Sequence, residues 1–275
     1  MKILVVGAGG FLGSEIHSQL KKRHVVEGTA HSKASGDLLK FDITNAAEVN
    51  RIFLQDFDAI INTAAISDPK ACEEDKILAY KTNVAGAKNL AEVCPQRTKL
   101  VYISSSSVFS GNGNFTEMDT PSPQNYYGET KLEGELATGK HPNSIIARTS
   151  WIFGYAKTDR NMAYQIISKL KAGQKVYAYA NDFNRPTFSE DIGSALEKLM
   201  QADAGGVWHI AGSDLVSRYE FALKIAAKLD LPESLLQKSG LPAARNRSMN
   251  IDKISALYKT QSLEDSLSKL KAKFA

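Results

Sequence analysis

The sequence predicts an α/β protein whose core is a Rossmann-type, doubly wound parallel sheet, followed by a smaller C-terminal α/β lobe. Three observations support this fold class. Short apolar runs alternate with helical patterns through the first half of the chain. Glycines 7, 10 and 13 separate the first apolar run from the first helical pattern. After Gly154, short polar segments replace the regular alternation.

The elements of the first half follow from the period of the apolar residues. Strands that are buried on both faces read as continuous apolar runs, whereas helices repeat apolar residues every three to four positions. On this basis strands are expected at 3–6, 24–29, 59–61, 100–104 and 144–148, and helices at 11–23, 45–55, 73–93 and 127–136. This alternation predicts a parallel sheet with helices on both faces.

The second half predicts a lobe interleaved with the main sheet. Helical patterns occur at 162–171, 191–200 and 219–229, separated by short polar segments. We therefore expect residues 1–154 to form the main domain, with later returns over about 181–212. Residues 155–275 are expected to form mainly a second lobe that binds the substrate.

Composition is that of an ordinary soluble globular protein, with 43% hydrophobic and 23% charged residues in 275. The net charge of +4 is scattered, so no nucleic-acid-binding stripe is expected. No apolar run approaches the ~20 residues that span a bilayer, and Met1-Lys2 leads directly into the first strand. We expect a cytoplasmic protein without membrane contact, with Cys72 and Cys94 as reduced, partly buried thiols.

The glycine turn predicts a dinucleotide site. Gly7 permits the tight turn, Gly10 lets a pyrophosphate approach the backbone, and Gly13 lets the helix pack closely on the strand. The first helical residues, Phe11 and Leu12, would present free N–H groups to the phosphates, aided by the helix dipole.

The end of the second strand favours NADP(H) over NAD(H). NAD sites carry an acidic residue about 20 positions beyond the glycines for the ribose 2′-hydroxyl. Here that stretch contains His31, Ser32 and Lys33, with no acid before Asp37. A hydroxyl and cations suit a 2′-phosphate, although an exposed polar loop would look the same, so NAD(H) and dual specificity stay open.

A Tyr–Lys pair predicts acid–base chemistry. Tyr127 and Lys131 are four residues apart on one face of a helix. A free phenol, with a pKa near ~10, is a weak acid–base catalyst near neutrality, and an ammonium beside it is expected to lower that pKa. The pair follows the serine run 104–107 at the end of a strand, where a hydroxyl would point into the crevice of the sheet. Two surface residues and a polar turn are the alternative.

Together these motifs resemble the extended short-chain dehydrogenase/reductase superfamily, and within it the dTDP-4-dehydrorhamnose reductases. The resemblance covers essentially the whole chain. It is carried by the glycine triplet, the Ser–Tyr–Lys set and the segments 42–43, 62–65, 103–111, 148–154, 185–191, 207–212 and 219–222.

The resemblance implies a role for each matching residue. Ser105 would hydrogen-bond the substrate carbonyl, Tyr127 would donate the proton, and Lys131 would activate it and contact the cofactor ribose. The other expected cofactor contacts are Asp42 and Ile43 at adenine, Ala64 and Ala65 along the cofactor, and Thr149 and Ser150 near nicotinamide. The expected substrate contacts are Ser106, Trp151, Asn161 and Arg185, the last two with a packing role as the alternative.

The chain departs from the family beside its catalytic hydroxyl. The following position is usually acidic, but here it is Ser106, and Ser107 stands where an aromatic residue is common. The segment 67–73 also differs. These departures do not affect the Ser–Tyr–Lys set expected for a reductase, but they leave the identity of the sugar open.

The sequence is compatible with three functions. The favoured one is NADPH-dependent reduction of the C4 ketone of a nucleotide-linked 4-keto-6-deoxy sugar. A nucleotide-sugar epimerase or dehydratase ranks lower, because dehydration would want an Asp-Glu pair where Ser106 and Ser107 stand. The third is a non-catalytic partner role, since the regulatory β subunit of methionine adenosyltransferase resembles the same reductases.

The sequence itself contains no specific signal for the oligomeric state. A homodimer is expected only from the frequency of dimers among soluble enzymes. Some relatives assemble through metal-bridged carboxylates, and Glu15 and Glu190 occupy candidate positions. We expect both to be plain surface acids, with no metal site.

Overall fold

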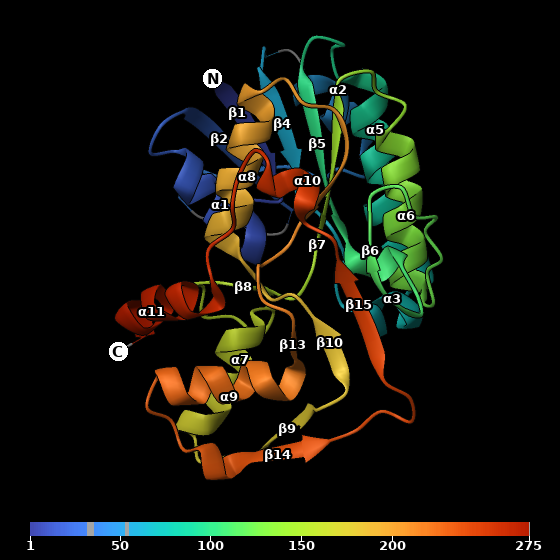
Figure 1. Cartoon of the computed structure of the whole chain (residues 1–275). Helices are drawn as coiled ribbons and strands as arrows, with labels where there is room; N and C mark the ends of the chain where they lie inside the picture. Colours follow the sequence, from blue (N-terminus) through green and yellow to red (C-terminus); the bar gives the residue numbers. More distant parts are fainter. Residues whose placement is uncertain (32–35, 53–54, 275) are drawn as a thin grey trace.

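A seven-stranded parallel sheet forms the centre of the protein (Figure 1). The computed structural model describes residues 1–31, 36–52 and 55–274. The strand order is β12-β7-β5-β4-β1-β2-β3. The strands are β1 (Lys2–Val6), β2 (Val25–Ala30), β3 (Leu39–Lys40), β4 (Ala59–Asn62), β5 (Lys99–Ser105), β7 (Ser144–Thr149) and β12 (Gly206–Ile210).

The strand order reverses between β1 and β4. From β1 the chain runs outward through β2 to β3 and then returns to β4 on the other side of β1, with Ile3 opposite Ala59 and Val6 opposite Asn62. Loops that leave neighbouring strands in opposite directions open a crevice at the carboxyl ends of the strands, which is where doubly wound sheets bind ligands.

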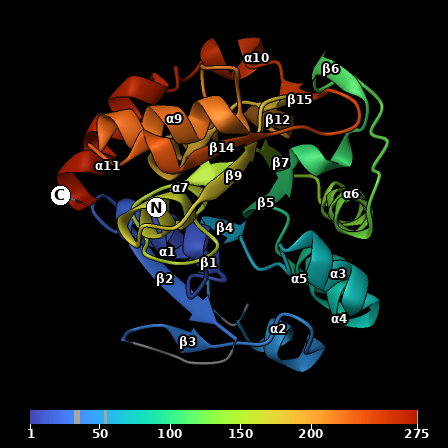
Figure 2. The same ribbon diagram turned by 90° about the horizontal axis from the view of Figure 1, so that it is seen from below.

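Helices cover both faces of this sheet (Figures 1 and 2). One face packs against α1 (Phe11–Leu20) and α8 (Ser189–Gln201), whose apolar residues join one core cluster with those of β1, β5 and β7. The other face packs against α2 (Ala46–Ile52), α5 (Gly86–Val93) and α6 (Tyr126–Thr138). This two-sided cover explains why the central strands are continuous apolar runs.

A second apolar core lies in the C-terminal half and includes Phe153, Phe188, Phe221 and Phe274. It is built by α7 (Met162–Lys171), α9 (Arg218–Lys228), α11 (Leu263–Phe274) and the parallel pair β9 (Val176–Tyr179) and β14 (Leu236–Ser239). Smaller elements connect this lobe to the main sheet: β6 (Asn112–Phe115), β8 (Ile152–Phe153), β10 (Asp182–Asn184), β11 (Thr187–Phe188), β13 (Val216–Ser217), β15 (Arg245–Met249), α10 (Asp252–Ser255) and two 3₁₀ turns, Ser106–Val108 and Glu233–Leu235.

The fold confirms the predicted class, but the expected helix over 73–93 is interrupted at Asp75, where α3 (Pro69–Glu74) ends and a new helix begins. From Lys76 to Val93 the chain is helical as expected, through α4 (Lys76–Tyr80), a π-helix (Lys81–Ala85) and α5. Asp68 and Asp75 each accept hydrogen bonds from backbone N–H groups at the start of a new helix. Such side-chain caps stabilise separate helix starts, which periodicity alone does not reveal.

Three further expectations concern the cysteines, membrane spans and the second helix. Cys72 and Cys94 are free, buried thiols, as predicted. Among the helices of the described ranges, none is both long and apolar enough to cross a membrane. Of the expected helix over 45–55, positions 53 and 54 lie outside the described residues.

Gly13→Ala should destabilise the protein and weaken dinucleotide binding. A Cβ at Gly13 would fall well inside van der Waals contact of the Gly7 carbonyl oxygen, so α1 would have to move away from β1. We expect the free energy of unfolding to drop by roughly 1–3 kcal/mol, measured by urea denaturation.

Gly205→Ala is the matched control, since its Cβ would meet nothing closer than the Ser144 oxygen at 3.6 Å. Equal stability of the two variants, with unchanged NADPH binding by Gly13→Ala, would contradict the packing role assigned to Gly13.

Candidate active site

A cavity of about 1180 Å³ opens at the carboxyl edge of the main sheet and is lined by residues of the sheet and of the C-terminal lobe. The glycine turn, the ends of several parallel strands and the first turns of α6 line one part. Arginines of the C-terminal half line another. Of the residues expected from the sequence, the lining includes Gly7, Gly10, Phe11, Leu12, Gly13, His31, Asp42, Ile43, Ala64, Ala65, Ser105, Ser106, Tyr127, Lys131, Thr149, Ser150 and Trp151.

The glycine turn has the geometry that a pyrophosphate requires. Gly7 has a φ of +86°, and a Cβ there would lie 2.7 Å from the backbone nitrogen of Ala64. Gly10 caps α1 without any side-chain hydrogen bond to the N–H groups of the first turn. Phe11 and Leu12 begin the helix at the cavity wall. The turn therefore leaves helix N–H groups for a ligand and fits the phosphates of a dinucleotide.

Beyond the glycine turn, the cavity extends along the ends of β2 and β3. His31 is exposed, and its Nε2 lies 3.7 Å from Oδ2 of Asp42. Although burial raises the pKa of Asp42, hydrogen bonds from the backbone and side chain of Thr44, and the nearby His31, hold it below its ordinary value. Asp42 is thus a fixed anion at the cavity wall. Ser32 and Lys33, expected at a 2′-phosphate, lie outside the described residues.

Ser105 and Tyr127 meet at the cavity wall. Ser105 ends β5, and its Oγ accepts a hydrogen bond from the Ser107 backbone N–H at 3.1 Å. Tyr127 lies in the first turn of α6. Burial raises the pKa of Tyr127 to about 12, opposed by a hydrogen bond with Ser105. The expectation that Lys131 lowers this pKa is therefore wrong: burial dominates and keeps the phenol protonated.

Lys131 is a buried amine one turn further along α6. Burial lowers its pKa to about 7, while the Glu135 carboxylate acts in the opposite direction. Its Nζ lies 4.0 Å from the centre of the Tyr102 ring, a contact that favours the ammonium form. The charge of Lys131 thus depends on its surroundings near neutral pH.

A buried ion pair that the sequence reasoning missed lies beneath this site. Arg148 Nε donates to Glu135 Oε1 at 2.9 Å, and Arg148 Nη2 donates to Oε2 at 2.7 Å. Ser104 also donates to this carboxylate. Burial, reinforced by Arg148 and opposed by Glu117, lowers the pKa of His209 beside it to about 4. The sequence did contain a signal for Glu135, because a residue four positions after Lys131 lies beside it on the same face of the helix.

The end of β7 positions the remaining cavity residues. Thr149 Oγ1 donates to the Ser104 carbonyl at 3.1 Å, and Ser150 Oγ donates to the Arg185 carbonyl at 2.8 Å. Trp151 follows with a φ of 39° and has the Arg218 guanidinium 4.4 Å from the centre of its ring. These contacts fix the wall between the strand ends and the arginines.

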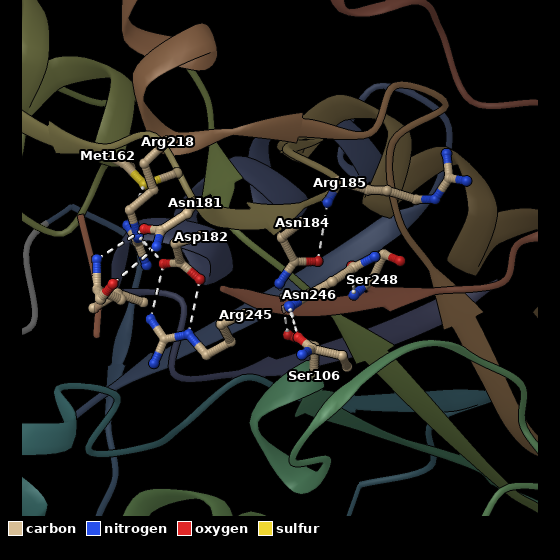
Figure 3. A network of polar contacts seen from close by, with 12 residues as sticks. Ser106, Met162, Asn181, Asp182, Asn184, Arg185, Arg218, Arg245, Asn246 and Ser248 are labelled. Atoms are coloured by element: carbon tan, nitrogen blue, oxygen red, sulfur yellow. Dashed lines mark hydrogen bonds and ion pairs between the residues drawn. The ribbon is translucent and has the colours of Figure 1, made fainter. Parts of the chain in front are cut away.

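Asn161 and Arg185 do not line the cavity, contrary to expectation. Asn161 is fully buried, and its amide donates to the carbonyls of Gly154 at 2.7 Å and Ala156 at 2.8 Å while its oxygen caps α7. The Arg185 guanidinium donates to the Ser213 carbonyl and points away from Asp182 and its neighbours (Figure 3). Both side chains hold loops in place.

Glu15 and Glu190 are not plain surface acids. Glu15 is half-buried and accepts hydrogen bonds from the Ala156 N–H at 2.7 Å and from Ser189. Glu190 accepts from the Tyr155 hydroxyl at 3.0 Å and pairs with Lys269. These contacts tie α1 and α8 to the C-terminal lobe. Within the described ranges, no three His, Cys, Asp or Glu side chains converge as a metal site would require.

The fold is that of the extended short-chain dehydrogenase/reductase class. The family described as "RmlD substrate binding domain" matches residues 1–269, and the chain belongs to this family, that of the dTDP-4-dehydrorhamnose reductases. The resemblance seen in the sequence is thereby confirmed.

Individual relatives agree with this membership. The chain is 33% identical to a dTDP-4-dehydrorhamnose reductase of Aggregatibacter actinomycetemcomitans, over 82% of this chain and 78% of the relative. It is 30% identical to "Probable low-salt glycan biosynthesis reductase Agl14" of Haloferax volcanii, over 100% of this chain and 99% of the relative. Methionine adenosyltransferase 2 subunit beta of Xenopus tropicalis is 29% identical, over 86% of this chain and 74% of the relative.

A solved structure shows the same fold with a cofactor. The dTDP-4-dehydrorhamnose reductase of Bacillus anthracis, crystallised in complex with NADP, superposes with a TM-score of 0.85 and 26% identity, covering 98% of this chain and 96% of that one.

Glu135→Gln should destabilise the protein strongly, because it leaves the Arg148 charge buried without its carboxylate. Removing one partner of a buried ion pair costs about 3–5 kcal/mol, and urea denaturation would measure the loss. Glu133→Gln, an exposed change on the same helix, should leave stability within about 0.5 kcal/mol. Equal stability of the two variants would contradict the anchoring role of the pair.

Proposed function

We propose that the protein reduces the C4 ketone of a nucleotide-linked 4-keto-6-deoxy sugar with NADPH. The observation that carries the proposal is the partly buried, protonated Tyr127 beside Ser105 on the wall of the cavity that also contains the glycine turn. Family membership supports the reductase class. The particular sugar and nucleotide are the part that the assay below tests.

The proposed chemistry divides between cofactor and protein. Bound NADPH would supply the hydride. Tyr127, held as a neutral phenol by burial, would donate its proton to the substrate carbonyl oxygen. Ser105 would hydrogen-bond the same oxygen, and an ammonium on Lys131 would stabilise the phenolate left behind.

We assign the cofactor to the region of the cavity at the glycine turn. The contacts expected from the sequence that line it (Gly7, Gly10, Phe11, Leu12, Gly13, His31, Asp42, Ile43, Ala64, Ala65, Lys131, Thr149 and Ser150) would hold NADP(H). NADPH is favoured over NADH because no acidic residue ends β2, where His31 follows instead. The lobe within 155–275 would bind the substrate, with Ser106 and Trp151 at the sugar.

A dehydratase or epimerase is less well supported. Ser106 is buried and accepts a hydrogen bond from the Asn184 amide at 3.3 Å, so it offers neither acid nor base for the elimination of water. The partner role raised by the likeness to methionine adenosyltransferase 2 subunit beta is one of the outcomes that the assay distinguishes.

Tyr127→Phe should lower kcat by about 10²–10⁴-fold, the usual contribution of a general acid. The assay follows loss of reduced-nicotinamide absorbance with dTDP-4-keto-6-deoxy sugar and NADPH, then NADH. NADPH binding by the variant is the control and should be retained. Tight NADPH binding by the wild-type protein without any oxidation would move the proposal toward the partner role, and a preference for NADH would contradict the assignment at His31.

The reduction should slow as pH rises through neutrality. The pKa of Lys131 is lowered to about 7, so its ammonium is present below pH 7 and lost above it. Tyr127, with a pKa of about 12, stays protonated throughout. We expect kcat/KM to fall with rising pH above about 7, measured between pH 5.5 and 9. Lys131→Arg, which cannot lose its charge in this range, should abolish that fall; a flat wild-type profile would contradict the role of the ammonium.

A further inference from the structure

A buried ion pair lies behind the Tyr–Lys pair and has no part in the reaction as proposed above. Glu135 of α6 is 5% exposed and Arg148 of β7 is 3% exposed, and neither residue lines the cavity. Removing two charges from water costs free energy that their attraction only partly returns, so a buried ion pair is weak evidence of a purely stabilising role. Its position next to the site therefore calls for a functional explanation.

The same face of α6 carries the carboxylate of this pair and the Lys131 amine. Glu135 follows Lys131 by one helical turn, and both side chains are buried where α6 packs on β5. Side chains four residues apart are neighbours on a helix. The carboxylate thus lies beside the amine in surroundings that screen their attraction far less than water does.

Hydrogen bonds fix the Glu135 carboxylate in this position. Arg148 Nε donates to Oε1 at 2.9 Å, Arg148 Nη2 donates to Oε2 at 2.7 Å, and the Ser104 hydroxyl donates to Oε1. Arg148 is itself held between the Phe109 ring, 5.0 Å from its guanidinium carbon, and His209 Nε2, 3.5 Å from its Nη1. A bidentate arginine fixes both the orientation and the charge of a carboxylate.

Glu135 is the anion that acts on Lys131. The other titratable groups around the amine are Tyr127 on α6, Tyr102 on β5 and Cys72 on α3. Burial raises the pKa of all three, so that they are uncharged near neutral pH. Among the described residues that influence the Lys131 pKa, Glu135 is the main one that opposes burial.

We propose that Glu135 and Arg148 are positioning residues for the reduction: Arg148 holds the Glu135 carboxylate beside Lys131, and this carboxylate keeps the Lys131 amine charged at neutral pH. The assignment rests on the proposed function, in which the ammonium stabilises the phenolate of Tyr127. It adds the ion pair that determines how far the pH can rise before the ammonium is lost.

The first test measures kcat/KM between pH 5 and 9 for Glu135→Gln and Glu135→Asp. Glu135→Gln removes the charge that opposes burial at Lys131, so the pH above which kcat/KM falls should drop by about one unit or more. At pH 8 this shift is a loss of about tenfold, whereas at pH 5 the activity should approach that of the wild type. Glu135→Asp keeps the charge and should restore most of the wild-type profile, which a merely structural defect would not do.

The second test follows Lys131 without any turnover. Lysine labelled with ¹³C at Cε is titrated by NMR, and the Lys131 signal is assigned by its absence in Lys131→Arg. It should titrate near pH 7 in the wild type and at lower pH in Glu135→Gln. If Glu135→Gln does not fold, the double variant Glu135→Gln/Arg148→Met removes both buried charges and should show the same downward shift.

Glu197→Gln is the matched control. Glu197 lies on α8, is also buried, and is bound by the Nε and Nη2 groups of Arg23, away from the cavity. The substitution should lower stability without moving the kcat/KM profile or the Lys131 titration.

The two tests separate this inference from the proposed reaction. An unchanged Lys131 titration and an unchanged profile in folded Glu135→Gln, or in the double variant, would overturn the positioning role and retain the reductase. A lowered Lys131 titration without turnover of any keto sugar would retain the action of the ion pair on Lys131 and reject the reductase.

Discussion

The close packing of α6 on β5 is the constraint on which the site depends. A Cβ at Gly128 would clash with the Ser107 carbonyl, and one at Gly134 would clash with the Tyr102 hydroxyl. These glycines let the helix approach the strand closely enough for Tyr127 to reach Ser105 and for Lys131 to lie over the Tyr102 ring. Tertiary approach of two backbones, rather than helix propensity, thus determines where the functional groups lie.

The same closeness sets the electrostatics of the site. Because α6 is pressed against the sheet, Lys131 is buried and Tyr127 is partly buried, and burial favours the uncharged form of both. The Glu135 carboxylate, bound on the other side by Arg148, is the main group that favours the Lys131 ammonium. One face of α6 thus supplies both a proton donor, Tyr127, and an amine, Lys131, whose charge changes near neutral pH.

Sequence reasoning succeeded where a local pattern carries the information. The continuous apolar runs located the central strands, and the glycine triplet located the turn between β1 and α1. It failed where distant segments meet, as in the joining of Arg218 with Arg245 around Asp182. Asn161 was placed in the cleft by resemblance, although an asparagine directly before the apolar helix at 162–171 also predicts the N-cap that the structure shows.

Tracing the transferred atoms tests the proposed reduction most directly. Wild-type protein would be incubated with dTDP-4-keto-6-deoxy sugar and NADPH carrying deuterium at both C4 positions of the nicotinamide, and the product sugar analysed by NMR and mass spectrometry. Hydride transfer to the C4 ketone would leave one deuterium, at C4 of the sugar. Tight binding of NADPH and substrate without deuterium in the product, or deuterium at another carbon, would contradict it.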